Sequence, residues 1–194
     1  MSPRKRRWRL PALILLLVVG AAALGGLYLY RKQQFRAFYV NLRTTGLNAA
    51  AANNHVGTID NLEPYLQRHP EDVDVLVAYA RARPLIAAPE NAHLTQTIIA
   101  LRYLLRIEPD RMTERRSLLN LYVRAGYAAE ALDTATLLLE KYKDQHPDAY
   151  RGRALSLARL RRFGEALTAT QAWVKVSPRD LEAQMRQLWL MALD

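Results

Sequence analysis

The chain has 194 residues, of which 51% are hydrophobic and 24% are charged, and it contains no cysteine. This composition excludes a disordered chain, a disulfide-linked scaffold and any site built on cysteine. The formal net charge is +10, but nine cationic residues and no acidic residue precede Asp60. The chain from Asp60 onward is therefore nearly neutral, and the charge distribution predicts no nucleic-acid partner.

An uncharged apolar run extends from Leu10 to Tyr30. As a helix, its 21 residues would measure roughly 31 Å, about the thickness of the hydrocarbon core of a bilayer. Aromatic residues stand at both edges, as they do at membrane interfaces. The flanking cations are Arg4, Lys5, Arg6, Arg7 and Arg9 before the run, and Arg31, Lys32 and Arg36 after it. The pattern predicts a basic tail over residues 1–9 and a transmembrane anchor over residues 10–30.

A cleaved signal peptide is the main alternative, because Ala21-Ala22-Ala23 resembles a small-residue cleavage site. The apolar run continues past these alanines, however, which favours an uncleaved anchor. A buried core helix would be shorter and would not be bracketed by cations. Five cations before the run against three directly after it predict a cytoplasmic N-terminus and an extracytoplasmic body.

Beyond residue 35, apolar residues recur at helical spacing, and no stretch alternates with the period of a strand. Prolines beside acidic residues mark the ends of successive helices. The sequence also matches itself: Gly126–Leu132 aligns with Arg161–Leu167, about 35 residues later. A period of about 34 residues, with a small residue early in each second helix, predicts stacked helix hairpins. We expect an all-α, right-handed solenoid of helix-turn-helix repeats behind the N-terminal transmembrane helix.

The expected organisation after the anchor follows from this period and from the proline-containing turns. It comprises a juxtamembrane helix over residues 31–38, repeats over residues 39–72, 73–110, 111–146 and 147–180, and a terminal helix over residues 181–194. The first two repeats fit less well, because Thr58 and Thr97 stand where alanine is usual and Pro64 lies inside a helix.

These repeats resemble the tetratricopeptide repeat family, most clearly in residues 147–180. The resemblance covers residues 39–180 and is carried by small and aromatic residues at fixed positions. The residues expected to pack within and between the helices are Tyr122, Ala131, Ala135, Tyr150, Ala154, Phe163, Ala166 and Trp173. The resemblance implies a scaffold that binds another polypeptide. Membrane-anchored proteins with such repeats are often bacterial assembly, secretion or chaperone-accessory factors. Together with the predicted anchor, the resemblance implies a single-pass protein of a bacterial inner membrane.

In this family, residues on the first helix of each pair face a concave groove. The corresponding residues are Arg116, Asn120, Arg124, Arg151 and Arg159. Arg116 and Asn120 resemble the opening of the carboxylate clamp of some members, although Gly152 stands where the next clamp asparagine would be. The resemblance therefore implies an acidic or C-terminal peptide segment as partner. A solvated basic face is the alternative interpretation.

No pattern for catalysis is present. The four histidines have no histidine or carboxylate at metal-ligand spacing, and there is no HExxH motif or glycine-rich phosphate loop. We therefore expect a protein that is not an enzyme and uses no cofactor or metal. The alternative is the anchor and regulatory part of a larger enzyme or secretion complex whose active part lies elsewhere.

The end of the chain is expected to carry exposed apolar residues. Leu181, Met185, Leu188 and Ala192 form one stripe of the terminal helix, which we expect to pack on the preceding pair. The residues outside this stripe would remain uncovered, although terminal repeats usually have a polar outer face. We therefore expect something to cover this surface: a second copy of the chain through Trp189, Leu190 and Leu193, another partner, the membrane surface or further sequence. A frayed end with a few exposed apolar side chains is the alternative.

Overall fold

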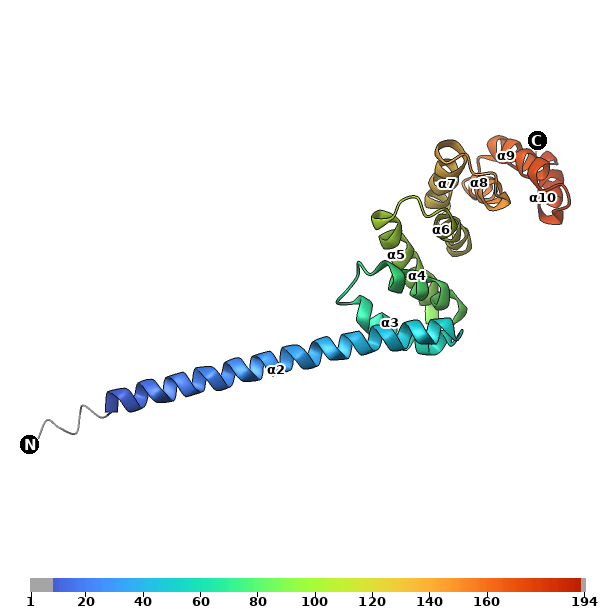
Figure 1. Cartoon of the computed structure of the whole chain (residues 1–194). Helices are drawn as coiled ribbons and strands as arrows, with labels where there is room; N and C mark the ends of the chain where they lie inside the picture. The colour runs from blue at the N-terminus through green and yellow to red at the C-terminus, as the bar shows by residue number, and fades with distance from the viewer. Residues whose placement is uncertain (1–8, 193–194) are drawn as a thin grey trace, which may run out of the picture.

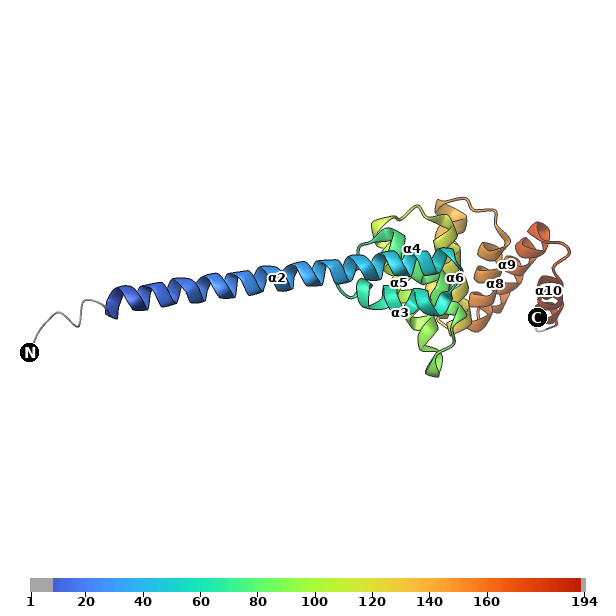
Figure 2. The same cartoon turned by 60° about the horizontal axis from the view of Figure 1, so that its bottom comes forward.

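The computed structural model describes residues 9–192, which form helices without any strand (Figure 1). The helix α2 (Arg9–Ala51) is 43 residues long. Its N-terminal part projects away from a stack of shorter helices (Figure 2). The predicted basic tail over residues 1–9 lies outside the described residues, apart from Arg9.

The helices after the projecting part of α2 follow one another as pairs within the described chain. The C-terminal part of α2 pairs with α3 (His55–Leu66), α4 (Val73–Ala82) with α5 (Ala92–Ile107), α6 (Met112–Ala125) with α7 (Ala128–Thr136), and α8 (Pro147–Arg159) with α9 (Phe163–Val176). Each second helix also packs on the first helix of the next pair, and α10 (Leu181–Met191) packs on α9. The predicted all-α fold of stacked helix hairpins is confirmed.

Short irregular segments complete two of the pairs. The 3₁₀ turns η1 (Arg83–Leu85) and η2 (Pro89–Asn91) connect α4 to α5, where the sequence places two prolines. The π-helical turn η3 (Leu137–Lys141) extends α7. The longer connection in the second pair accounts for the weaker fit of this repeat to the 34-residue period.

Side-chain caps explain why helices begin at the proline-containing turns. Asp72 accepts a hydrogen bond from the backbone N–H of Val75 at the start of α4. Asp180 does the same for Ala183 in α10. Such caps satisfy backbone N–H groups that have no partner inside the helix. At the other end, α6 stops at Gly126, whose φ of 86° is accessible to glycine at little cost.

The first helix of the solenoid is not separate from the apolar run, because α2 continues without a break from Arg9 to Ala51. The structure therefore has no helix end between the predicted anchor, the juxtamembrane helix over residues 31–38 and the first repeat. Only the C-terminal part of α2 is packed: a Cβ atom at Gly46 would lie 2.2 Å from Leu62 of α3. The absence of a side chain there lets α2 and α3 approach closely.

Most of the apolar part of α2 projects away from the other described helices (Figures 1 and 2). Its side chains between residues 15 and 30, where the structure describes them, are exposed. By length and composition α2 is able to cross a bilayer, a property that an N-terminal signal sequence shares.

Most of the residues expected to pack are buried between the helices. Fully buried or nearly so are Tyr122, Ala131, Ala135, Ala154, Ala166 and Trp173. Tyr150 is half-buried, and Phe163 is 39% exposed. Phe163 lies at the first position of α9, where its ring contacts Trp189 edge to face with centroids 6.2 Å apart. This aromatic contact joins α9 to the terminal helix.

The face of α10 that packs inward is opposite to the predicted one. Leu181, Met185 and Leu188 are 71%, 70% and 69% exposed, whereas Ala183 and Leu190 are buried against the cluster around Trp173. Leu188 and Leu190 are two residues apart, so they point to nearly opposite sides of a helix. The predicted stripe is therefore wrong, and the predicted role of Leu190 in self-association is wrong because only 2% of it is exposed. Leu193 lies outside the described residues.

Candidate functional site

Ion pairs connect the first helix of one pair to the beginning of the next first helix. In each pair, an arginine meets a carboxylate that lies at or just before the N-terminus of the following first helix, where the helix dipole favours negative charge. The contacts are Arg43 with Asp72 at 2.7 Å and with Asp74 at 3.1 Å, Arg81 with Glu114 at 3.5 Å, Arg116 with Asp144 at 2.8 Å, and Arg151 with Glu182 at 3.0 Å.

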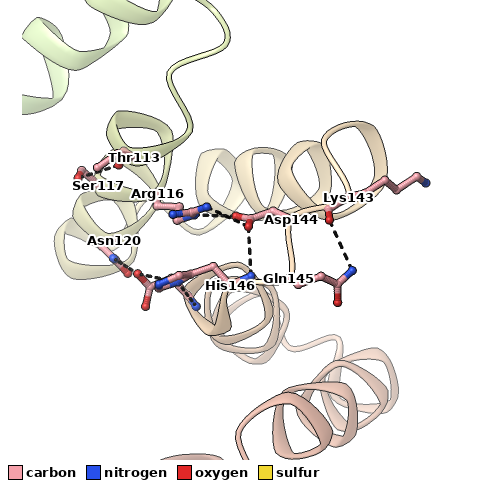
Figure 3. Close-up of polar contacts among 9 residues, drawn as sticks. Thr113, Arg116, Ser117, Asn120, Lys143, Asp144, Gln145 and His146 are labelled. Carbon is pink, nitrogen blue, oxygen red and sulfur yellow. Dashed lines mark hydrogen bonds and ion pairs between the residues drawn. The ribbon is translucent and has the colours of Figure 1, made fainter.

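Arg116 makes the most complete of these contacts (Figure 3). Its Nε and Nη2 donate to the two carboxylate oxygens of Asp144, at 2.8 and 3.1 Å. Asp144 also accepts a hydrogen bond from the backbone N–H of His146, at 3.1 Å. Burial by itself would raise the pKa of Asp144, but the hydrogen bonds from Arg116 and His146 outweigh it and hold this pKa below its ordinary value. Arg116 thus fixes the chain entering α8.

Arg151 and Arg159 are also engaged in contacts between helices. Arg151 Nε donates to Glu182 of α10. Arg159 Nη1 donates to the backbone carbonyl of Val123, at 2.6 Å. This carbonyl belongs to the last turn of α6, where helix carbonyls lack a partner within the helix. Together with Arg116, these residues join neighbouring repeats, so the five predicted residues do not form one open basic strip.

Asn120 and Arg124 differ from the other three. Asn120 Nδ2 donates to Asp148 at 3.1 Å, while its Oδ1 is buried and has no hydrogen-bond partner among residues 9–192. Arg124 is exposed and forms no ion pair or side-chain hydrogen bond with the described part of the chain. A buried carbonyl oxygen without a donor is unfavourable, and a ligand that supplies an N–H group would remove that cost.

Both residues line a pocket of about 340 Å³ between α4 and α6. Val77 and Ala80 of α4 and Leu121 of α6 provide apolar wall, and Leu101 of α5 lies beneath them. The polar wall consists of Thr113, Ser117, Asn120 and Arg124, together with the ion-paired Arg81 and Glu114. The site can therefore accept an apolar side chain, an N–H group and an anionic group at neighbouring points.

The groove does not continue between α6 and α8, where the family clamp would be completed. A Cβ atom at Gly152 would lie 2.7 Å from methyl carbons of Leu119, so α6 and α8 are in close contact there. The glycine at the expected clamp position is thus a packing residue. Within residues 9–192, no group of three or more histidine and carboxylate side chains could hold a metal ion.

Sequence reasoning missed the α4 side of the pocket and the acidic partners of the arginines. A detectable signal was present: acids recur 28 to 33 residues after Arg43, Arg81, Arg116 and Arg151, close to the repeat length. The guanidinium of Arg43 reaches both Asp72, the N-cap of α4, and Asp74 in its first turn.

The sequence matches no family model and no curated protein. Several solved structures of MamA nevertheless share its arrangement of helices. The chain superposes on MamA of AMB-1 with a TM-score of 0.65, covering 80% of this chain and 81% of that one at 19% identity. For MamA of MSR-1 the TM-score is 0.63, with 80% and 86% covered at 17% identity. For residues 41 to the end of MamA from Desulfovibrio magneticus RS-1 it is 0.64, with 80% and 84% covered at 10% identity.

The helices have a tetratricopeptide-type fold. At these identities the likeness concerns the fold, and the groove residues must be judged on their own contacts.

Proposed function

We propose that this chain is a membrane-anchored scaffold that binds a segment of another polypeptide in the pocket between α4 and α6. The observation that carries this proposal is Asn120, which lines the pocket and whose buried Oδ1 lacks a donor within residues 9–192. A backbone N–H of an extended peptide is a suitable donor. The apolar wall around Val77 and Leu121 would take an adjacent side chain.

The charge of the pocket favours an anionic group on the bound peptide. Glu114 is balanced by Arg81 and Arg111, whereas Arg124 has no acidic partner among the described residues. A guanidinium binds a carboxylate through two parallel hydrogen bonds. We therefore expect the preferred segment to present an acidic side chain or a C-terminal carboxylate to Arg124.

The exposed apolar part of α2 supports anchoring of the scaffold in a membrane. An apolar helix surface of this size is unfavourable in water, and lipid would cover it. The cation bias around the run supports a cytoplasmic N-terminus and repeats outside, as in a bacterial inner membrane. The anchor would then hold the pocket between α4 and α6 near the membrane surface.

The terminal helix supports a second contact, with another copy of the chain. Leu181, Met185 and Leu188 follow one another on one face of α10, and Trp189, 50% exposed, lies beside them. Trp189 was predicted to take part in self-association, and it remains in this proposal. In this proposal, Leu181, Met185 and Leu188 take the role in self-association that was predicted for Leu190, which is buried.

Peptide capture by the full chain in lipid nanodiscs tests the pocket. The probes are immobilised peptides, acidic or neutral, each with a free or an amidated C-terminus. We expect wild type to retain peptides that carry carboxylates, and Arg124→Glu to lose them because its charge repels them. Ser117→Trp should also lose them, because an indole would fill the pocket while leaving the charge of Arg124 unchanged.

Two matched controls make the outcome decisive. Arg102→Glu makes the same charge change on an exposed residue of α5, and Thr168→Trp adds the same ring to an exposed position of α9. Both should bind peptides like wild type. Equal retention by Arg124→Glu and Arg102→Glu, or equal loss, would contradict the proposed pocket.

A further inference from the structure

A second and larger pocket, of about 760 Å³, lies where α2 leaves the solenoid. One wall is a single face of α2, and the opposite wall is the end of α3 with the turn that follows it. On α2 the lining residues recur every three or four positions, so that they share one side of the helix. They alternate between aromatic and cationic types: Tyr28, Arg31, Lys32, Phe35, Arg36 and Tyr39.

The opposite wall is held in place by aromatic contacts. The ring of His69 stacks on Tyr65 with centroids 4.7 Å apart and meets Tyr39 edge to face at 5.4 Å. Arg68, which precedes His69, is exposed and lines the same pocket. The turn after α3 thus adds Arg68 to the four basic side chains of α2 that line the pocket, Arg31, Lys32, Arg36 and Arg43.

The charge of this pocket is uncompensated. Arg31, Lys32, Arg36 and Arg68 form no ion pair with any residue in the range 9–192, and the pocket lining contains no aspartate or glutamate. Arg43, at the far end, is the exception because it contacts both Asp72 and Asp74. Four cations that are unpaired within the described chain, set around aromatic walls, favour an anionic ligand that also has an apolar part.

The position of the pocket along α2 identifies such a ligand. The apolar run ends at Tyr30, and at 1.5 Å per residue Arg36 lies roughly 9 Å beyond it. The polar headgroup layer occupies about 5–8 Å on each side of the hydrocarbon core. If the run spans a bilayer, Arg31 and Lys32 therefore lie at headgroup depth and Arg36 at the outer edge of this layer, with Tyr28 facing the acyl boundary.

We propose that this pocket binds the headgroup of an anionic phospholipid, a contact that rests on the membrane anchor in the proposed function. The guanidinium and ammonium groups bind the phosphate, and Tyr28, on the membrane side of these cations, contacts the glycerol and upper acyl region. A second copy of the chain is disfavoured as the occupant, because two such faces would bring their cations together. The bound lipid would fix the angle at which the solenoid leaves the membrane.

Native mass spectrometry of the full chain, delipidated in detergent, tests this proposal. The probes are dioctanoyl phosphatidylglycerol, dioctanoyl phosphatidylcholine and inorganic phosphate at equal concentration. We expect wild type to retain phosphatidylglycerol in preference to the other two. The variant Arg36→Ala/Arg68→Ala should lose this preference, by roughly fivefold for each cation removed.

The control variant Arg102→Ala/Arg106→Ala removes two exposed cations of α5 and should bind phosphatidylglycerol like wild type. Equal binding of the two lipids, equal losses in the two variants, or equally strong binding of inorganic phosphate would each overturn the proposal. So would a wild-type dimer that has no lipid preference and is lost in Arg36→Ala/Arg68→Ala, because a second copy would then occupy the face.

Failure of this proposal is distinguishable from failure of the proposed function. Peptide capture by the α4–α6 pocket does not involve Arg36 or Arg68, so it reports on the scaffold alone. Resistance of the chain to extraction from membranes by alkaline carbonate reports on the anchor alone. The short-chain lipids bind from solution. The preference of the chain for one lipid over the other is therefore measured independently of peptide capture and of membrane anchoring.

Discussion

The guanidinium of Arg116 binds both carboxylate oxygens of Asp144, which lies 28 residues further along the chain and immediately before the next first helix. Arg43, Arg81 and Arg151 make comparable contacts one repeat length apart. Basic residues on the first helices therefore connect neighbouring repeats. A peptide ligand has to use the pocket residues that these contacts leave without a complete set of partners in the described chain, namely Asn120 and Arg124.

Removing Arg116 should destabilise the solenoid, because Asp144 would remain largely buried without its main partner. We expect Arg116→Ala to lower the free energy of unfolding by about 1.5–3 kcal/mol, the range for hydrogen bonds to charged groups. Arg116→Lys should recover only part of the lost free energy of unfolding, since an ammonium keeps the charge but cannot make the two parallel hydrogen bonds. Chemical unfolding of the full chain in detergent measures both. As the comparison, Arg162→Ala removes an exposed ion pair with Glu165 and should leave the unfolding curve almost unchanged.

The low pKa of Asp144 predicts a loss of stability in acid. Burial raises the pKa of Asp144, but the hydrogen bonds from Arg116 lower this pKa by more than burial raises it. The pKa of Asp144 in the folded protein therefore lies below its unfolded value near 3.8. The stabilisation is therefore complete above about pH 4 and is lost as the pH falls through the folded pKa. The same direction holds for Asp72, where the hydrogen bonds from Arg43 and Tyr65 outweigh burial. Melting temperatures of wild type and Asp144→Asn should converge as the pH falls below 4; curves that stay parallel would refute this assignment.

Two glycines in helices should respond to alanine with opposite signs. At Gly152 the added methyl would lie 2.7 Å from the buried Leu119, so Gly152→Ala should destabilise the fold by about 1–3 kcal/mol through overpacking. At Gly164 no atom lies within 4 Å of the added carbon, so Gly164→Ala should stabilise α9 by up to about 1 kcal/mol. Thermal unfolding of the two variants decides this. Equal changes in the melting temperature of Gly152→Ala and Gly164→Ala would mean that α6 and α8 are not in close contact at Gly152.

The membrane topology is checked by reporter fusions after residue 60. We expect alkaline phosphatase to be active there and a cytoplasm-only reporter to be silent, because five cations precede the apolar run and three directly follow it. The mass of the mature chain separates an anchor from a signal peptide, since cleavage after Ala23 would remove the whole basic tail. A silent phosphatase beside an active cytoplasmic reporter would reverse the topology.

The exposed face of α10 predicts concentration-dependent association of the full chain. Replacing Leu181, Met185 and Leu188 by Gln, Lys and Glu should reduce self-association in sedimentation experiments with little loss of helix, because these side chains are about 70% exposed and contribute little buried area. The control replaces the exposed Leu85, Val56 and Ile99 by the same three residues, in that order, and should associate like wild type. Association that is unaffected by the α10 variant would exclude this face.

Local patterns in the sequence determined the helices and their order. The 3.6-residue spacing of apolar side chains, the capping residues Asp72 and Asp180, and the repeat of small residues at Ala131 and Ala166 act over a few turns or over one repeat. They are visible without knowledge of neighbouring helices. The all-α solenoid and the burial of these alanines could be predicted for that reason.

The tertiary structure alone decided how each helix is rotated and which side chains meet. Leu190 rather than Leu188 faces inward because α10 settles on the cluster around Trp173 through its smallest residue, Ala183. Arg116 is neutralised because the turn after η3 brings Asp144 back to α6. The pocket on α2 exists because α3 folds back along that helix and places Arg68 beside Phe35 and Arg36. These contacts join residues about 10 to 30 positions apart, and they depend on packing angles that periodicity in one helix does not encode.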